Sequence, residues 1–182
     1  MFGLLPGRRR DGCLRFFAAS WAQGASTSRR VGSPSIPGIG RASGAYKGAQ
    51  ALGRSRGGWG TKVHGSVTGR GHPVVLKLTP GQAGDAPQAA DLLAGQTRGR
   101  VRAVVGDKGY DSDANVALIR RLRARVVIPP LGCRKHQRRY SKRLYRGRNV
   151  VERFWQKAKQ YRRVATRYDK LDTSYLAFVH LA

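Results

Sequence analysis

Strand-like and helix-like patterns alternate through residues 61–130 of this chain, and their order restricts its fold more than any other feature. Apolar and polar residues alternate in two segments joined by a turn, and two further segments are short apolar runs, which predicts four strands. The predicted strands are residues 61–69, 73–79, 101–105 and 125–128. Helical signals separate the last three strands. This order predicts an α/β fold.

Capping signals place one helix after the second strand and another after the third. For the first helix, Asp85 stands at an N-cap position, Pro87 near the first helical position and Gly95 at the end. Asp111 or Ser112 caps the second helix. Its apolar side chains recur at three-residue spacing, at Val116, Ile119 and Leu122. Both segments are therefore predicted to be helical.

The N-terminal segment, residues 1–44, shows no sustained period of either strand or helix. We expect it to be disordered or unrelated to the rest of the chain, which leaves residues 45–182 as the folded domain. Arg15 interrupts its only apolar stretch, so we do not expect a secretory signal there. No apolar run approaches the ~18 residues that span a bilayer, so we expect no membrane partner. Cys13 and Cys133 lie far apart and are expected to be reduced, as in a cytosolic protein.

The charge balance is strongly basic. Thirty-six Lys and Arg face nine Asp and Glu, giving a formal net charge of +27. Such a charge attracts polyanions and favours nucleic acid as the partner, although an Arg-rich protein encoded by GC-rich DNA would share it. Residues 131–148 contain many of these cations and no acid, which predicts a solvated loop or a polyanion-binding surface.

The few acids stand at informative positions. Asp107 follows the predicted strand 101–105, at the sheet edge where open α/β sheets present ligand-binding groups. Asp111 and Asp113 precede a helix, where carboxylates interact favourably with free backbone N–H groups. Asp107 is therefore the strongest candidate of the three for a chemical role.

Glu152, the single glutamate, lies in the longest helical pattern, residues 149–167. The apolar stripe of that helix consists of Val151, Phe154, Trp155, Ala158, Tyr161 and Ala165. The opposite face carries Glu152 together with Arg148, Gln156, Lys159 and Arg163. Glu152 is therefore either a surface ion-pair partner or a ligand for a divalent metal, flanked by cations that could hold a phosphate backbone.

Four segments carry a family resemblance: "ALGRSRGGWGTKVHG", "PVVLKLTPGQAGDAPQAADLL", "VVGDKGYDSDANVALIRRLRARVVIPP" and "YRGRNVVERFWQKAKQYRRVATRYDKLDTSYLAFVHLA". From about residue 41 to residue 182, the chain resembles the catalytic part of bacterial insertion-sequence transposases of the DDE class, insertion sequence five family. The resemblance implies an RNase H-like fold and a site of two Asp and one Glu. That site holds two Mg²⁺ for cleavage and transfer of DNA strands.

Residue by residue, the resemblance maps the second Asp onto Asp107 and the Glu onto Glu152, as catalytic residues and metal ligands. Arg148, Lys159 and Arg163 would contact the DNA backbone. The implied partner is double-stranded DNA at transposon ends, in the bacterial cytoplasm at the nucleoid. The resemblance leaves the oligomeric state open, a homo-oligomer included.

The family's first Asp lies on the first strand of the fold, and no segment of this chain matches that block. Asp11 is the only acid before Arg41, and its surroundings are not strand-like. We therefore expect a remnant with the first strand missing from the sheet, a marginal fold and no transposition activity. The alternative is a non-catalytic basic nucleic-acid-binding protein.

Overall fold

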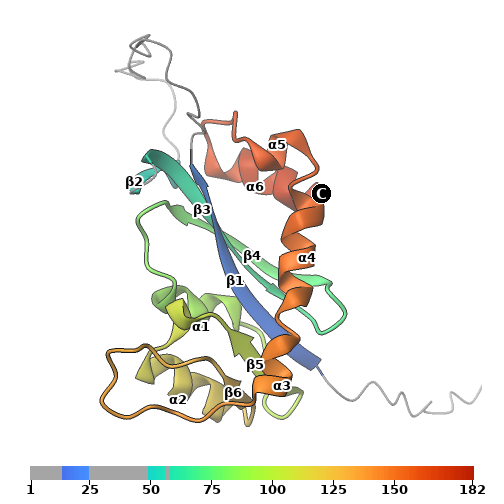
Figure 1. The fold of residues 1–182 in the computed structure, drawn as a ribbon. Coiled ribbons are helices and arrows are strands. Elements are labelled where there is room, and N and C mark those ends of the chain that lie inside the picture. Colours follow the sequence, from blue (N-terminus) through green and yellow to red (C-terminus); the bar gives the residue numbers. More distant parts are fainter. Residues whose placement is uncertain (1–13, 25–48, 56–57) are drawn as a thin grey trace, which may run out of the picture. The chain divides into compact units, whose positions relative to one another are not determined.

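The computed structural model describes residues 14–24, 49–55 and 58–182, and its elements are labelled in Figure 1. The strands are β1 (Leu14–Gly24), β2 (Gly53–Ser55), β3 (Gly58–Val67), β4 (Pro73–Pro80), β5 (Val101–Gly106) and β6 (Arg125–Val127). The helices are η1 (Ala86–Gln88), α1 (Ala89–Leu92), η2 (Lys108–Tyr110), α2 (Asp113–Arg121), α3 (Lys142–Arg146), α4 (Asn149–Ala158), α5 (Arg162–Ala165) and α6 (Asp172–Leu181).

The strands form a mixed sheet in the order β2-β3-β1-β5-β6, with β4 also paired to β3. Strand β5 is parallel to both of its neighbours, whereas β2 is antiparallel to β3. The α/β fold class is confirmed, and β3, β4, β5 and β6 correspond to the four strands predicted from the sequence.

Strand β1 corrects the prediction for the N-terminal segment. We expected no ordered element before residue 45 and a sheet without its first strand, yet β1 lies between β3 and β5. Its register pairs Phe17 with Val105 and Ala18 with Gly106. A strand between two others commonly has an unbroken apolar run instead of an alternating pattern, and the run from Phe16 to Ala19 fits that description. Residues 1–13 and 25–48, with Asp11 and Cys13 among them, lie outside the described residues.

The chain divides into two compact units. The first contains His64–Leu76, Gly84–Trp155 and the described part of Met1–Ser20. The second contains Lys77–Ala83, Gln156–Ala182 and the described part of Trp21–Val63. Each unit is described separately below.

In the first unit, α1 and α2 lie beside β5 and β6 (Figure 1). The core between these elements contains Leu92, Val101, Val104, Tyr110, Ile119 and Ile128, among others. The alternating pattern of residues 61–69 predicts one exposed polar face for β3. In the structure that face is buried too, because His64 and Ser66 are fully buried. The Ser66 hydroxyl donates a hydrogen bond of 3.1 Å to the Leu92 carbonyl, which compensates its burial.

The second unit shows that the predicted helix 149–167 is too long. Helix α4 ends at Ala158, and a separate short helix, α5, begins at Arg162. Tyr161, assigned to the apolar stripe, is 54% exposed, so burial does not support a continuous helix there. The pattern analysis also missed α6, which packs beside α5 (Figure 1). The buried Tyr175 of α6 donates a hydrogen bond of 2.8 Å to the Val164 carbonyl of α5.

Asp111 anchors the basic segment 131–148 instead of capping α2. Ser112 is the N-cap, and its hydroxyl accepts a hydrogen bond of 3.1 Å from the Asn115 amide. The fully buried Asp111 carboxylate accepts hydrogen bonds from the Leu131 amide (2.8 Å) and Arg134 Nε (2.6 Å), and forms an ion pair with Arg138. This part of the basic segment is therefore held to the first unit and is not wholly solvated.

We predict that Asp111→Asn lowers the free energy of unfolding by about 2–4 kcal/mol, because it removes the buried carboxylate charge that two partly buried arginines contact. Asp113 is the matched control. It contacts the same two arginines, but its side chain is 82% exposed. Asp113→Asn should cost less than about 1 kcal/mol. Urea unfolding of both variants measures the difference, and equal losses would contradict the anchoring role.

Candidate functional site

Asp107 stands directly after the last residue of β5, where the chain leaves the sheet to form η2. Its side chain is 34% exposed. Because β5 is paired on both sides, its carboxyl end is fixed by hydrogen bonds to β1 and β6. The sheet thus presents this carboxylate from a rigid position, as the sequence predicted for its backbone.

Glu152 lies in the first turn of α4, with its side chain 48% exposed. The position of α4 depends on Gly65 of β3, against which the ring of the buried Trp155 packs. A Cβ atom at Gly65 would lie 2.8 Å from that ring and 3.1 Å from a Leu76 methyl group. Only a residue without a side chain permits this close approach of helix to strand.

Arg148 brings the two carboxylates together. One terminal nitrogen of its guanidinium donates to Asp107 Oδ1, and the other lies 2.7 Å from Glu152 Oε1. Burial of the guanidinium alone would lower the pKa of Arg148. The hydrogen bond and the charge of Asp107 outweigh that effect, and the pKa is raised above its ordinary value. Arg148 is thus a fixed cation between Asp107 and Glu152.

A second group of polar side chains lies close to Asp107. His64 Nδ1 is 3.4 Å from the Tyr110 hydroxyl and 3.8 Å from Asp85 Oδ1. Asp85 makes no capping hydrogen bond to η1 with its side chain; its carboxylate packs against Gly109, where a Cβ atom would come within 2.6 Å. Burial, together with the charges of Asp85 and Asp107, raises the pKa of Tyr110 well above its usual range, so the phenol stays neutral.

Sequence reasoning missed this second group. His64 is one of the polar residues in the alternating strand pattern of residues 61–69, and Asp85 stands at a predicted helix N-cap. Neither pattern indicates that both side chains approach Tyr110. The available signal was the short spacing between Tyr110 and Asp107 within "GDKGYDSD".

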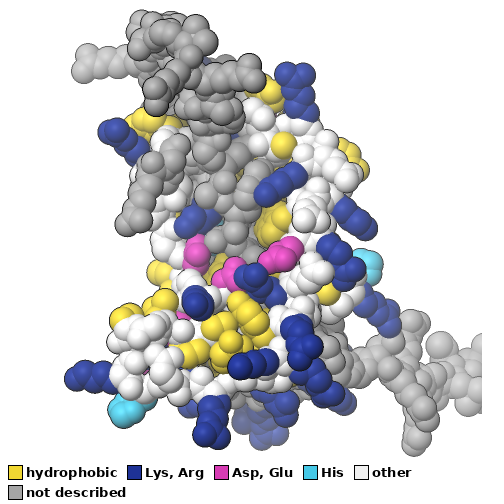
Figure 2. Space-filling model, in the orientation of Figure 1, with side chains coloured by type: hydrophobic (Ala, Val, Ile, Leu, Met, Phe, Trp, Pro, Cys, Tyr) yellow, Lys and Arg dark blue, Asp and Glu magenta, His cyan; other side chains and the backbone are white. Residues whose placement is uncertain are grey.

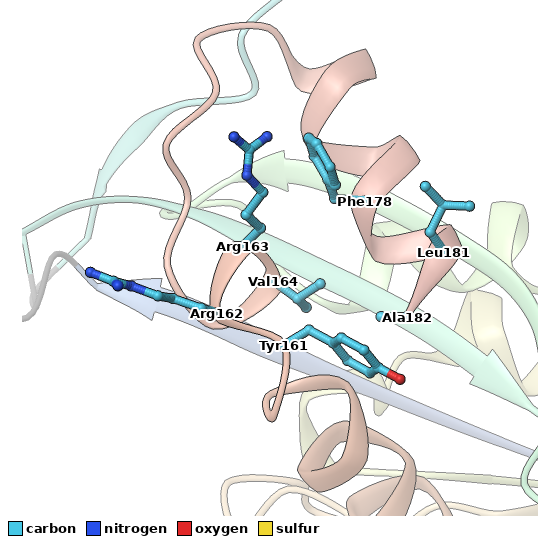
Figure 3. A pocket seen from close by; sticks show the side chains of 7 residues that line it. All are labelled: Tyr161, Arg162, Arg163, Val164, Phe178, Leu181 and Ala182. Carbon is cyan, nitrogen blue, oxygen red and sulfur yellow. The ribbon is translucent and has the colours of Figure 1, made fainter.

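Lys159 and Arg163, the other predicted DNA contacts, belong to the second unit. The Arg163 guanidinium lies 4.6 Å from the centroid of the Phe178 ring. Figure 3 shows these two side chains side by side at a pocket of about 300 Å³ that α5 and α6 line, while Arg162 points away from it. Arg148 is therefore the one predicted cation that the described structure places in contact with Asp107 and Glu152.

On the molecular face drawn in Figure 2, acidic side chains (magenta) lie next to Lys and Arg side chains (dark blue). The arrangement suits a polyanion that approaches through the cations while the acids remain paired with neighbouring arginines.

Comparison with known proteins bears on the family of the chain and not on the roles of single residues. The family described as "Transposase DDE domain" matches residues 26–182. The chain belongs to this family. A Brucella ovis protein named as a transposase for insertion sequence element IS6501 is 42% identical over 123 residues, which cover 67% of this chain and 93% of that protein. No solved structure matches the chain significantly. Among the described residues, no helix is long and apolar enough to cross a bilayer.

DDE transposases generally use divalent metal ions, and the residues that the structure describes do not by themselves fit a site of that kind. Within the described part of the chain, no three His, Cys, Asp or Glu side chains come together closely enough to hold a metal. Asp107 and Glu152 supply two carboxylates, and both already bind one guanidinium. The guanidinium contacts one oxygen of each carboxylate, so a Mg²⁺ ion would have to share both groups with a competing cation.

We predict that Gly65→Ala lowers the free energy of unfolding by about 1–3 kcal/mol, because the added methyl group overlaps the Trp155 ring. Gly132→Ala is the matched control, since a Cβ atom there meets nothing within 4 Å. Thermal unfolding of both variants tests the close approach of α4 to β3. An unchanged Tm for Gly65→Ala would contradict it.

Proposed function

We propose that this chain is a DNA-binding transposase domain of the DDE class that no longer cleaves or joins DNA. Asp107 and Glu152 are, in this proposal, two of the family's three metal-binding acids. The observation that carries the proposal is the guanidinium of Arg148 between these two carboxylates. The central place of β1 in the sheet supports an RNase H-like arrangement of the strands.

The loss of catalysis follows from the number of carboxylates. In-line displacement at a phosphate by two metals needs oxygen ligands that bridge the ions and leave positions open for the substrate. The family's first acid lies on the first strand, and β1 contains neither Asp nor Glu. Two carboxylates that share an arginine do not provide that ligand set.

DNA binding, in contrast, requires only accessible cations. The exposed cations of the basic segment 131–148 are Lys135, Arg139, Lys142, Arg143 and Arg146. Lys159 and Arg163 remain candidates for backbone contacts in the second unit. Arg148 is a weaker candidate than the sequence suggested, because both of its terminal nitrogens already contact carboxylates. Contacts of this kind supply affinity and register but not sequence choice.

We expect the chain to bind duplex DNA with an affinity that falls steeply as salt rises, because bound Lys and Arg release counterions from the phosphates. The double variant Arg139→Gln/Arg143→Gln should lower the slope of log affinity against log salt by about 0.9 for each phosphate that the variant no longer neutralises. Fluorescence anisotropy with labelled duplexes of two unrelated sequences measures this slope. Exposed Arg98 and Arg100 give a control double variant, Arg98→Gln/Arg100→Gln, with the same change in charge outside the segment. Equal slopes for the two double variants would contradict binding through the basic segment.

We also expect the purified chain to leave DNA uncut when Mg²⁺ or Mn²⁺ is present. An assay with a supercoiled plasmid and a labelled duplex carrying insertion-sequence ends detects both nicking and strand joining. Metal-dependent cleavage that disappears in Asp107→Asn would refute the inactivity and leave family membership intact.

A further inference from the structure

We infer that Arg148 is the resident counter-ion of Asp107 and Glu152 and excludes divalent cations from the space between them. The inference rests on the proposed function in one respect: it takes Asp107 and Glu152 as two of the family's metal-binding acids. It assigns to Arg148 a positioning role in place of the DNA contact expected from the sequence.

The geometry of the bridge supports this assignment. A guanidinium is a planar fork whose terminal nitrogens can bind two different carboxylates at once. Arg148 uses this property, since one nitrogen contacts Asp107 and the other Glu152. A lysine ammonium has only one nitrogen and would bind two separated carboxylates less well.

Local structure holds the guanidinium in place. Arg148 directly precedes α4 and lies four residues before Glu152, so the second contact forms within one helical turn. The guanidinium carbon also lies 5.4 Å from the centroid of the Tyr145 ring, a distance at which a cation is attracted to the ring face. A cation tethered at two sides competes at a high effective concentration with any ion from solution.

The surroundings favour the same outcome. The side chains of Arg148, Asp107 and Glu152 are 32%, 34% and 48% exposed, so the bridge is partly shielded from water and salt. In a chain with a formal net charge of +27, a divalent cation is also repelled by the overall field. Removal of Arg148 would take away the cation that both carboxylates contact, and two carboxylates near one position without a counter-ion attract a divalent ion.

The test measures Mn²⁺ alone, without DNA, on the full chain. Electron paramagnetic resonance of Mn²⁺ reports free ion, and thermal unfolding reports stabilisation by bound ion. For the wild-type chain we expect no loss of the free-ion signal and no rise in Tm at millimolar Mn²⁺. Mn²⁺ binding by the wild-type chain that Asp107→Asn abolishes would overturn the inference, whether or not any Arg148 variant folds.

In Arg148→Met we expect a lower Tm without metal and a rise in Tm when Mn²⁺ is added. Its affinity for Mn²⁺ should exceed that of the wild-type chain by about tenfold or more, and the double variant Arg148→Met/Glu152→Gln should lose this gain. Arg146→Met removes the same charge from an exposed position two residues away and should behave as the wild-type chain.

A folded Arg148→Met chain that still ignores Mn²⁺ would also overturn the inference. If Arg148→Met does not fold, Arg148→Lys replaces it, because the ammonium keeps the charge but cannot bridge both acids. Its expected affinity for Mn²⁺ lies between those of the wild-type chain and Arg148→Met, and an affinity equal to that of the wild-type chain would count against the bridge. None of these outcomes depends on DNA cleavage, so failure of the inactivity proposal would be seen separately.

Discussion

The parallel pairing of β5 on both sides is the constraint from which the rest of the first unit follows. Hydrogen bonds to β1 and β6 fix the register of β5, and its residues from Ala103 to Val105 are buried. Strand β5 ends at Gly106, so Asp107 follows directly at the sheet edge, where its side chain is 34% exposed. Helix α4 carries Glu152 and begins directly after Arg148. Its Trp155 ring packs against Gly65, so the absence of a side chain at Gly65 sets how closely α4 approaches β3.

Arginine–carboxylate contacts also organise a chain that is otherwise self-repelling. Asp111 and Asp113 share Arg134 and Arg138, while Asp107 and Glu152 share Arg148. Asp107, Asp111 and Asp113 therefore offset positive charge where two segments distant in sequence meet. These acids lower the affinity for phosphate mainly at the arginines with which they pair. The exposed cations outside these pairs can still bind a polyanion.

Much of this structure could be predicted from the sequence. Period-two alternation and short apolar runs located β3 to β6, and the position after β5 identified Asp107. The failures have physical causes. The central strand β1 lacks an alternating pattern. The apolar stripe predicted for residues 149–167 did not reveal that Tyr161 is exposed. The capping motif did not show that Asp111 binds the distant basic segment 131–148. Contacts such as Arg148 with Asp107, 41 residues apart, are tertiary and leave no local signal.

Strand β1 precedes residue 26, where the family match begins, yet it takes a place inside the sheet. Pairing in a sheet uses backbone N–H and C=O groups that every residue except proline carries, so a site in the sheet accepts any sufficiently apolar segment of suitable length. Architecture and chemistry are thereby separable in this molecule. Many apolar sequences can form the backbone hydrogen bonds of a strand at this place in the sheet. A catalytic carboxylate, in contrast, requires an Asp or Glu side chain, which the backbone cannot replace.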